Sequence, residues 1–464
     1  MTAKQPNPRQ RPGAVELLSP AGTLKHMQYA FAFGADAVYA GQPRYSLRVR
    51  NNSFDQENLA KGIAQAHSLG KQFYVASNIL PHNSKIKTYL ADMAPVIALK
   101  PDALIMADPG LIAMVREQWP DMPVHLSVQA NTVNYAAVKF WQSLGLTRVI
   151  LSRELSLDEI AEIRQQCPEM ELEVFVHGAL CIAYSGRCLL SGYFNHRDPN
   201  QGTCTNACRW QYKVHGTTQD QCGDSQKIDF DAFSAMQSVA PMDAENSPKR
   251  HPLADQVYLI EEKQRPGEFM PILEDEHGTY IMNSKDLRAI HHVDRLVKMG
   301  IDCLKIEGRT KSYYYAARTA QLYRQAIDDA VQNKAFDPAL YHSLDSLANR
   351  GYTDGFYQRH PDQAYQSYLE NSSDSAHQQF VGEIAAFNPA SGMAQVVVKN
   401  QFEVGDSLQV ILPAGNKIIQ LTHMESETGK PMQRAPGGGY VVHIQLPDAD
   451  YNNGLLAKRL VKAQ

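Results

Sequence analysis

Four cysteines lie within 28 consecutive residues and are the side chains of this chain best suited to hold a metal: Cys181, Cys188, Cys204 and Cys208. Thiolates gathered this closely in a protein without a secretion signal usually bind a metal ion or an iron–sulfur cluster. Six, fifteen and three residues separate them, unlike the paired two-residue spacing of zinc ribbons and fingers. An iron–sulfur cluster needs only thiolates that converge in space, so it is favoured over zinc and over inert thiols.

The three remaining cysteines have different expected roles. Cys222 lies in the same segment and could replace one of the four ligands. Cys167 ends a predicted helix and Cys303 begins a predicted core strand, so we expect both to be small buried hydrophobic side chains. Disulfides are not expected, because residues 1–13 are polar and proline-rich and lack the apolar core of a signal peptide.

Two other side chains suit proton transfer. His177 and Glu307 end two predicted strands, where barrel enzymes place acid–base groups, although either could be structural. Glu173 lies deeper on the same face as His177 and is expected to be a structural partner of an arginine or lysine. Lys305 and Lys311 with Arg309 form a small basic group that suits phosphate contact or is ordinary solvated charge.

Short runs rich in branched apolar residues alternate with amphipathic segments along the first 335 residues, which is typical of strand–helix units around a parallel sheet. The predicted strands are 15–19, 37–40, 72–77, 103–107, 124–129, 148–152, 172–177 and 302–306. The predicted helices are 23–33, 56–69, 85–99, 110–118, 136–144, 157–166, 284–299 and 312–332. Eight units predict an α/β fold, a (β/α)8 barrel of the triosephosphate isomerase type. An open doubly wound sheet is the weaker alternative, because no Gly-rich dinucleotide fingerprint follows the first strand.

The chain divides into three predicted parts. Residues 1–335 form the barrel, and a long insert after its seventh strand, residues 178–279, carries the cysteine cluster. Residues at the ends of barrel strands line the active face, so the insert is expected to lie over the barrel mouth. Residues 336–378 form a helical connector and a polar linker. Residues 379–464 contain six short alternating runs separated by turns, which predict a small C-terminal β-barrel.

Length, composition and net charge limit the kinds of protein that this chain can be. The 464 residues, 44% hydrophobic and 20% charged, suffice for a large core and a second domain. A net charge of −4 gives no global signal for nucleic acid, so any such contact must come from a local patch. No stretch approaches the roughly 18–20 apolar residues of a membrane span, so we expect a cytoplasmic protein.

The chain resembles the collagenase-like peptidases of family U32 along nearly its whole length. The run EVFVHGALC at 173–181 continues through SGRCLLS at 185–191 and looks like the signature of that family. Further similar motifs are LSPAG at 18–22, CTNACRW at 204–210, NSKDL at 283–287 and LKIEGR at 304–309.

This resemblance implies prephenate-dependent formation of 5-hydroxyuridine at the wobble uridine of tRNA, the first step toward 5-carboxymethoxyuridine. It also implies a 4Fe–4S cluster on the cysteines of the insert, with the fourth ligand, Cys208 or Cys222, left open. The alternatives for this chain are a hydroxylase of ribosomal RNA or of a quinone precursor, and a non-catalytic RNA-binding scaffold. Peptidase activity is disfavoured, because the chain has no HExxH or GxSxG motif and a thiolate bound to iron cannot attack a substrate.

The implied substrates suggest binding residues. Prephenate is a dicarboxylate that suits bidentate arginine donors, and an unpaired anticodon base suits stacking on an aromatic ring. For each candidate, an ion pair or plain packing is the competing role. The candidates are Arg48, Arg50, Arg153, Arg187, Arg309, Tyr184 and Trp210, with Tyr193, Phe194 and Tyr212 as further aromatics.

Overall fold

The computed structural model describes residues 15–42, 44–46, 53–180, 286–347, 351–358 and 378–460, and, between 183 and 281, a sheet and a short hairpin. The chain divides into two compact units. The first unit comprises residues 1–178, 289–347 and 375–464, and the second comprises residues 179–288 and 348–374. Among the described helices, none is both long and apolar enough to cross a membrane.

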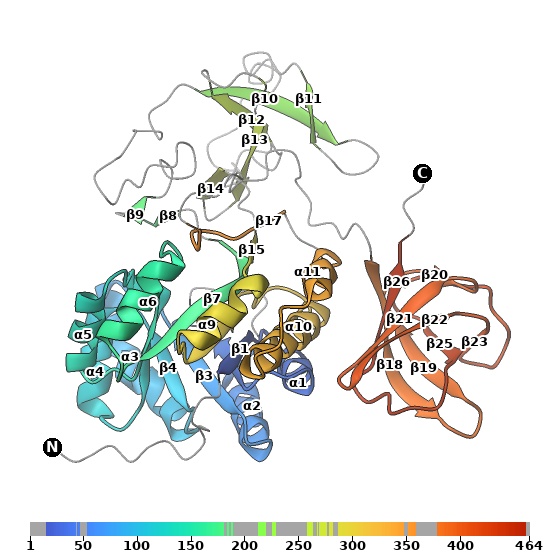
Figure 1. Cartoon of the computed structure of the whole chain (residues 1–464), viewed down its shortest axis with the longest axis horizontal. Helices are drawn as coiled ribbons and strands as arrows, with labels where there is room; N and C mark the ends of the chain where they lie inside the picture. The colour runs from blue at the N-terminus through green and yellow to red at the C-terminus, as the bar shows by residue number, and fades with distance from the viewer. Residues whose placement is uncertain are drawn as a thin grey trace, which may run out of the picture. The chain divides into compact units, whose positions relative to one another are not determined.

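A closed barrel of eight parallel strands forms the centre of the first unit (Figure 1). Its strands are β1 (Glu16–Pro20), β2 (Ala37–Gly41), β3 (Gln72–Ser77), β4 (Ala103–Met106), β5 (Val124–Leu126), β6 (Arg148–Ile150), β7 (Glu171–Ala179) and β16 (Cys303–Ile306). Neighbours in the chain pair in order, and β16 pairs with both β1 and β7, which closes the barrel. The predicted (β/α)8 fold is therefore confirmed.

Helices follow the barrel strands, as the amphipathic segments predicted. They are α1 (Leu24–Ala32), α2 (Gln56–Ser68), α3 (Asn83–Ala98), α4 (Pro109–Gln118), α5 (Tyr135–Ser143), α6 (Leu157–Gln166), α9 (Val293–Lys298) and α10 (Tyr313–Val331). Their starts follow from local chemistry, since Ser156 and Glu159 form a capping box for α6 and Ser312 caps α10. Cys167 and Cys303 are buried free thiols, as predicted.

The predicted helix over 284–299 is wrong in its first half. Residues 286–288 form β15 (Asp286–Arg288), and a 3-10 turn, η5 (Ile290–His292), precedes α9. In the second unit, β15 pairs in parallel with β17 (Tyr352–Thr353). That partner lies more than sixty residues away in the sequence, so no local periodicity reveals the strand.

The second unit also contains an antiparallel sheet with the order β11-β10-β12-β13-β14. Its strands are β10 (Tyr212–Gln219), β11 (Ser225–Ile228), β12 (Tyr258–Glu262), β13 (Phe269–Asp275) and β14 (Gly278–Ile281). A short hairpin pairs β8 (Ala183–Tyr184) with β9 (Arg187–Cys188). The described part of the segment after β7 therefore contains regular β structure.

The C-terminal domain, residues 378–460, is a β structure around a single apolar core. Seven strands form a sheet in the order β22-β21-β26-β18-β19-β25-β23, with β20 (Phe402–Glu403) and β24 (Arg434–Ala435) as a separate pair. The seven are β18 (Gln378–Asn388), β19 (Met393–Val398), β21 (Ser407–Leu412), β22 (Gly415–Gln420), β23 (Met424–Ser426), β25 (Val441–Gln445) and β26 (Leu455–Arg459). All six predicted runs are strands. A helix, α11 (Pro338–Asp345), precedes this domain in the chain.

Candidate active site

A network of buried charges fills the barrel interior below the strand ends. Arg148 on β6 is 1% exposed, and its Nη1 lies 2.7 Å from Glu16 Oε1 and 3.3 Å from Glu173 Oε2. Lys305 Nζ lies 2.7 Å from Glu173 Oε1. Buried charges persist where each is paired, so this network is structural. The predicted role of Glu173 is confirmed, whereas the expectation that Lys305 belongs to a phosphate-binding group is wrong because the residue is buried in this pair.

His125 on β5 belongs to the same interior. Its ring packs edge-on against Tyr74, with centroids 4.7 Å apart. Burial, followed by the charges of Arg148 and Lys305, holds the pKa of His125 well below its usual range. The imidazole is therefore neutral at physiological pH and adds no charge to the interior.

The Glu307 carboxylate occupies the barrel mouth, the end of the barrel where the strands finish. It follows β16 directly, and its Oε2 accepts a hydrogen bond of 3.1 Å from the Tyr39 hydroxyl on β2. The same hydroxyl lies 3.1 Å from the Ile306 carbonyl oxygen. Arg153 Nη2 is 3.8 Å from Glu307 Oε2. A hydroxyl on β2 and a guanidinium that follows β6 thus hold this carboxylate in place.

Arg153 is oriented by an aromatic ring. It follows β6, and its guanidinium carbon lies 3.8 Å from the centroid of Phe175 on β7. A guanidinium over a ring gains cation–π attraction, which holds Arg153 in place beside Phe175. The arrangement presents a planar cation beside Glu307 at the mouth.

His177 lies at the same end of β7. Its Nδ1 is 3.3 Å from the Tyr323 hydroxyl of α10, and that hydroxyl donates a hydrogen bond of 2.7 Å to the Val176 carbonyl. The Tyr323 hydroxyl thus fixes the orientation of the His177 ring at the end of β7. The Glu307 amide donates to the His177 carbonyl at 2.8 Å, so the two predicted acid–base residues sit on hydrogen-bonded neighbouring backbones.

Two glycines allow the mouth to pack this closely. A Cβ on Gly178, whose φ is +101°, would lie 2.4 Å from the Glu307 carbonyl oxygen. A Cβ on Gly41 would lie 2.3 Å from Arg309 Nη1, which donates a 2.7 Å hydrogen bond to Ser46 Oγ. Arg309 is buried, so its guanidinium is fixed by the loop after β2.

The structure brings four of the predicted site residues to one end of the barrel: His177, Glu307, Arg153 and Arg309. Tyr39, Ser46 and Tyr323 support them and were not predicted as site residues. Tyr39 and Tyr323 read as core aromatics, and only long-range pairing brings their hydroxyls to the site. No local sequence signal could have identified that role.

The remaining predicted site residues cannot be placed in this geometry. Arg48, Arg50, Trp210, Cys181, Cys204, Cys208 and Cys222 lie outside the described residues. Only the hairpin backbone is described for Tyr184, Arg187 and Cys188, where Tyr184 pairs with Arg187. The cluster ligands and the stacking aromatics therefore stay predictions.

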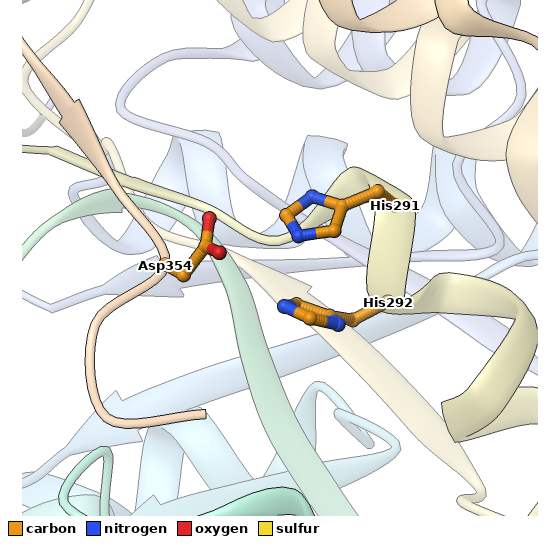
Figure 2. Close-up of side chains that lie close together, drawn as sticks. All are labelled: His291, His292 and Asp354. Carbon is orange, nitrogen blue, oxygen red and sulfur yellow. The ribbon is translucent and has the colours of Figure 1, made fainter. Parts of the chain in front are cut away.

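Two neighbouring histidines lie on η5. Figure 2 shows His291 and His292 projecting from η5, and their ring centroids are 3.8 Å apart. Asp354, drawn in the same figure, belongs to the second unit. These histidines were not among the predicted site residues.

This chain is similar to known proteins both in its barrel region and in its C-terminal domain. Residues 22–367 match the model of peptidase family U32, and residues 376–458 match that of the family U32 C-terminal domain. The chain is 61% identical over 444 residues to tRNA hydroxylation protein P of Escherichia coli strain K12, covering 96% of each chain. It is 58% identical over 448 residues to the protein of the same name from Haemophilus influenzae, again covering 96% of each. A collagenase of Porphyromonas gingivalis is 26% identical over 423 residues, covering 87% of this chain and 88% of that one.

Proposed function

This chain belongs to peptidase family U32. We propose that it is nevertheless a tRNA-modifying hydroxylase rather than a peptidase. The observation that carries the proposal is the 61% identity to a tRNA hydroxylation protein across 96% of both chains. The similarity to the collagenase is much lower, at 26%. The chain also lacks the HExxH and GxSxG motifs that would support peptide hydrolysis.

We further propose that the product is 5-hydroxyuridine at the wobble position of tRNA, made with prephenate as co-substrate on the way to 5-carboxymethoxyuridine. Support comes from the family motifs at 173–191 and 304–309, which include His177 and Glu307. A wobble base lies in the unpaired anticodon loop, so it can be splayed out of its stack into a pocket at small cost.

The barrel mouth offers the groups that this chemistry needs. Hydroxylation at C5 of uracil removes the hydrogen on that carbon and oxidises the carbon by two electrons. We propose Glu307, held by Tyr39 and Arg153, as the group that accepts this hydrogen as a proton, with a co-reactant supplying the oxygen atom and accepting the two electrons. The His177 imidazole is the second candidate acceptor at the mouth. Arg153 and Arg309 are the two cations suited to carboxylates of the co-substrate.

We also propose a 4Fe–4S cluster on Cys181, Cys188, Cys204 and Cys208. The supporting observation is four thiols within 28 residues directly after β7, the strand that carries His177. Such a cluster supplies redox-active iron when bound.

Nucleoside analysis tests the proposed activity. Deletion of the gene is expected to remove 5-hydroxyuridine and its derivatives from hydrolysed tRNA in mass spectrometry, and the wild-type gene is expected to restore them. Ribosomal RNA and quinones from the same strains separate the alternatives, because a change there with unchanged tRNA would reject the tRNA role. If the nucleosides of tRNA, the ribosomal RNA and the quinones are all unchanged while the protein still binds tRNA, the non-catalytic RNA-binding scaffold is the alternative that remains.

A further inference from the structure

A pocket of about 350 Å³ lies against α10, α11 and strands of the C-terminal domain, all within the first unit. None of its lining residues belongs to the barrel mouth. The lining includes Arg318, Ser343, Ser346, Gln409, Ile418 and Arg459. Its volume lies at the lower end of the range of about 300–1,000 Å³ typical of small-molecule sites.

The pocket contains a buried cation without an anionic partner. Arg318 on α10 is 1% exposed, and its Nη1 donates a 2.5 Å hydrogen bond to the neutral amide oxygen of Gln321. Its Nε has no hydrogen-bond partner, and no carboxylate in the described part of the chain pairs with it. Burial lowers the pKa of Arg318, but a guanidinium remains protonated.

This arrangement costs stability, and an anion would relieve the cost. A buried charge without a counter-ion is expensive, since one neutral hydrogen bond does not replace the hydration that the charge has lost. Arg148 shows the contrast, because it is equally buried but has three carboxylate partners. The protein therefore compensates one buried arginine internally and leaves the other facing a cavity.

The rest of the lining suits an oxyanion. Arg459 at the end of β26 adds a second guanidinium, and none of the residues that line the pocket is acidic. Ser343, Ser346 and Gln409 supply neutral hydrogen-bonding groups. His342 also lines the pocket, and its Nδ1 lies 3.9 Å from Asp345. Ile418 is 58% exposed and adds an apolar wall.

We propose that this pocket binds a phosphate group, with Arg318 and Arg459 as its cationic contacts. Two guanidiniums and several hydroxyl and amide groups match a group with three or four acceptor oxygens and up to two charges better than a single carboxylate. The phosphate belongs either to a small phosphorylated molecule or to the backbone of an RNA. The proposal does not depend on tRNA hydroxylation.

Titration of the full-length protein with inorganic phosphate at constant ionic strength tests the site. Calorimetry is expected to show saturable binding that Arg459→Gln weakens about tenfold, as loss of a charge-assisted contact predicts. Arg318→Met is expected to abolish phosphate binding and, without phosphate, to raise the melting temperature, because it removes an uncompensated buried charge. Lys417→Gln removes an exposed charge beside Ile418 and outside the lining, and should bind phosphate like the wild type.

The proposal is overturned if the wild type shows no saturable phosphate binding, or if Arg459→Gln binds as tightly as Lys417→Gln. A fall in melting temperature for Arg318→Met would mean that Arg318 supports the fold, and the exposed Arg459 would then decide the test alone.

Fluorescence anisotropy with labelled tRNA identifies the source of the phosphate. If it is an RNA phosphate, Arg459→Gln should weaken tRNA binding and reduce the salt dependence of log K by about one ion contact. If tRNA binds Arg459→Gln and the wild type equally, but inorganic phosphate binds Arg459→Gln more weakly than the wild type, the ligand is a small phosphorylated molecule. Both readouts are independent of hydroxylation, so failure of the proposed activity would leave them interpretable.

Discussion

The Glu383 carboxylate on β18 accepts a 2.9 Å hydrogen bond from the Tyr29 hydroxyl on α1, which joins the C-terminal domain to the first barrel helix. Lys25 Nζ lies 2.5 Å from the same carboxylate, and the Tyr313 hydroxyl donates to it at 3.2 Å. One acidic side chain thus accepts from three groups on two helices. An apolar contact adds to this interface, because Phe380 stacks on Tyr314 with centroids 4.6 Å apart.

Glu383→Gln is expected to destabilise the protein by about 1–3 kcal/mol, because three buried or half-buried donors lose their anionic acceptor. Burial raises the pKa of Glu383, but the hydrogen bonds from Lys25 and Tyr29 outweigh it and lower the pKa below 4.5. A lowered pKa in the folded state contributes stability above the unfolded value, and this is lost as pH falls through the folded value. Urea unfolding should therefore show a difference in stability between wild type and Glu383→Gln at pH 7, and this difference should shrink as the pH falls below 4.5.

Glu403→Gln is the matched control for this experiment. Glu403 lies in the same domain and is about half exposed, and among the described residues its carboxylate is paired with Arg434 alone, at 3.8 Å. Its replacement should change stability by less than about 0.5 kcal/mol. Equal effects of the two substitutions would contradict a special role for Glu383.

Glu307→Gln is expected to lower 5-hydroxyuridine formation by about 100-fold or more, because an amide cannot accept the proton that a carboxylate accepts. Tyr39→Phe should give a smaller loss, since it removes only the hydroxyl that orients Glu307. Complementation of a deletion strain followed by nucleoside mass spectrometry measures both. Full activity of Glu307→Gln, with the protein folded by circular dichroism, would exclude Glu307 as the base.

Glu173→Gln is expected to destabilise the barrel by about 3–5 kcal/mol, because Lys305 is then buried without a counter-charge. Adding Lys305→Met to the same chain should recover most of that loss, since the remaining group is apolar. Chemical denaturation of the single and double variants tests this coupling. A double variant no more stable than Glu173→Gln would show that the pair acts independently of charge.

Much of the barrel is readable from the sequence because its strands are short apolar runs and six of its eight helices begin at a side-chain N-cap, the exceptions being α3 and α9. Glu307 and His177 are predictable for the same reason, since each ends such a run. Features that depend on distant partners are not. Tyr39 reads as an ordinary strand residue, and only the closure of the barrel brings its hydroxyl to Glu307. Likewise, the strand 212–219 has few alternating apolar residues, so the sheet in the second unit left no clear pattern.

Gly178→Ala is expected to be more damaging than Gly70→Ala, although both glycines have positive φ. A Cβ at Gly70 meets no atom within 4 Å, so the cost is the strain of the left-handed region, about 1–2 kcal/mol. A Cβ at Gly178 also collides with the Glu307 carbonyl and would displace that residue. Thermal unfolding should place Gly178→Ala below Gly70→Ala, and only Gly178→Ala should lose hydroxylation. If Gly178→Ala and Gly70→Ala hydroxylate equally well, the exact position of Glu307 is not important for catalysis.

Iron content distinguishes the thiols proposed as ligands from those used for packing. About four irons and four sulfides per chain are expected after anaerobic purification, and Cys181→Ala and Cys188→Ala should lose most of both. Cys167→Ala is the control, because Cys167 is a buried free thiol at the end of α6 whose Sγ faces the Tyr135 carbonyl. The Cys167→Ala protein should keep its iron, since the Cys167 side chain serves packing and not metal binding. Zinc instead of iron in the wild type, or full iron in Cys181→Ala, would reject the cluster while leaving the barrel mouth and its carboxylate as they are.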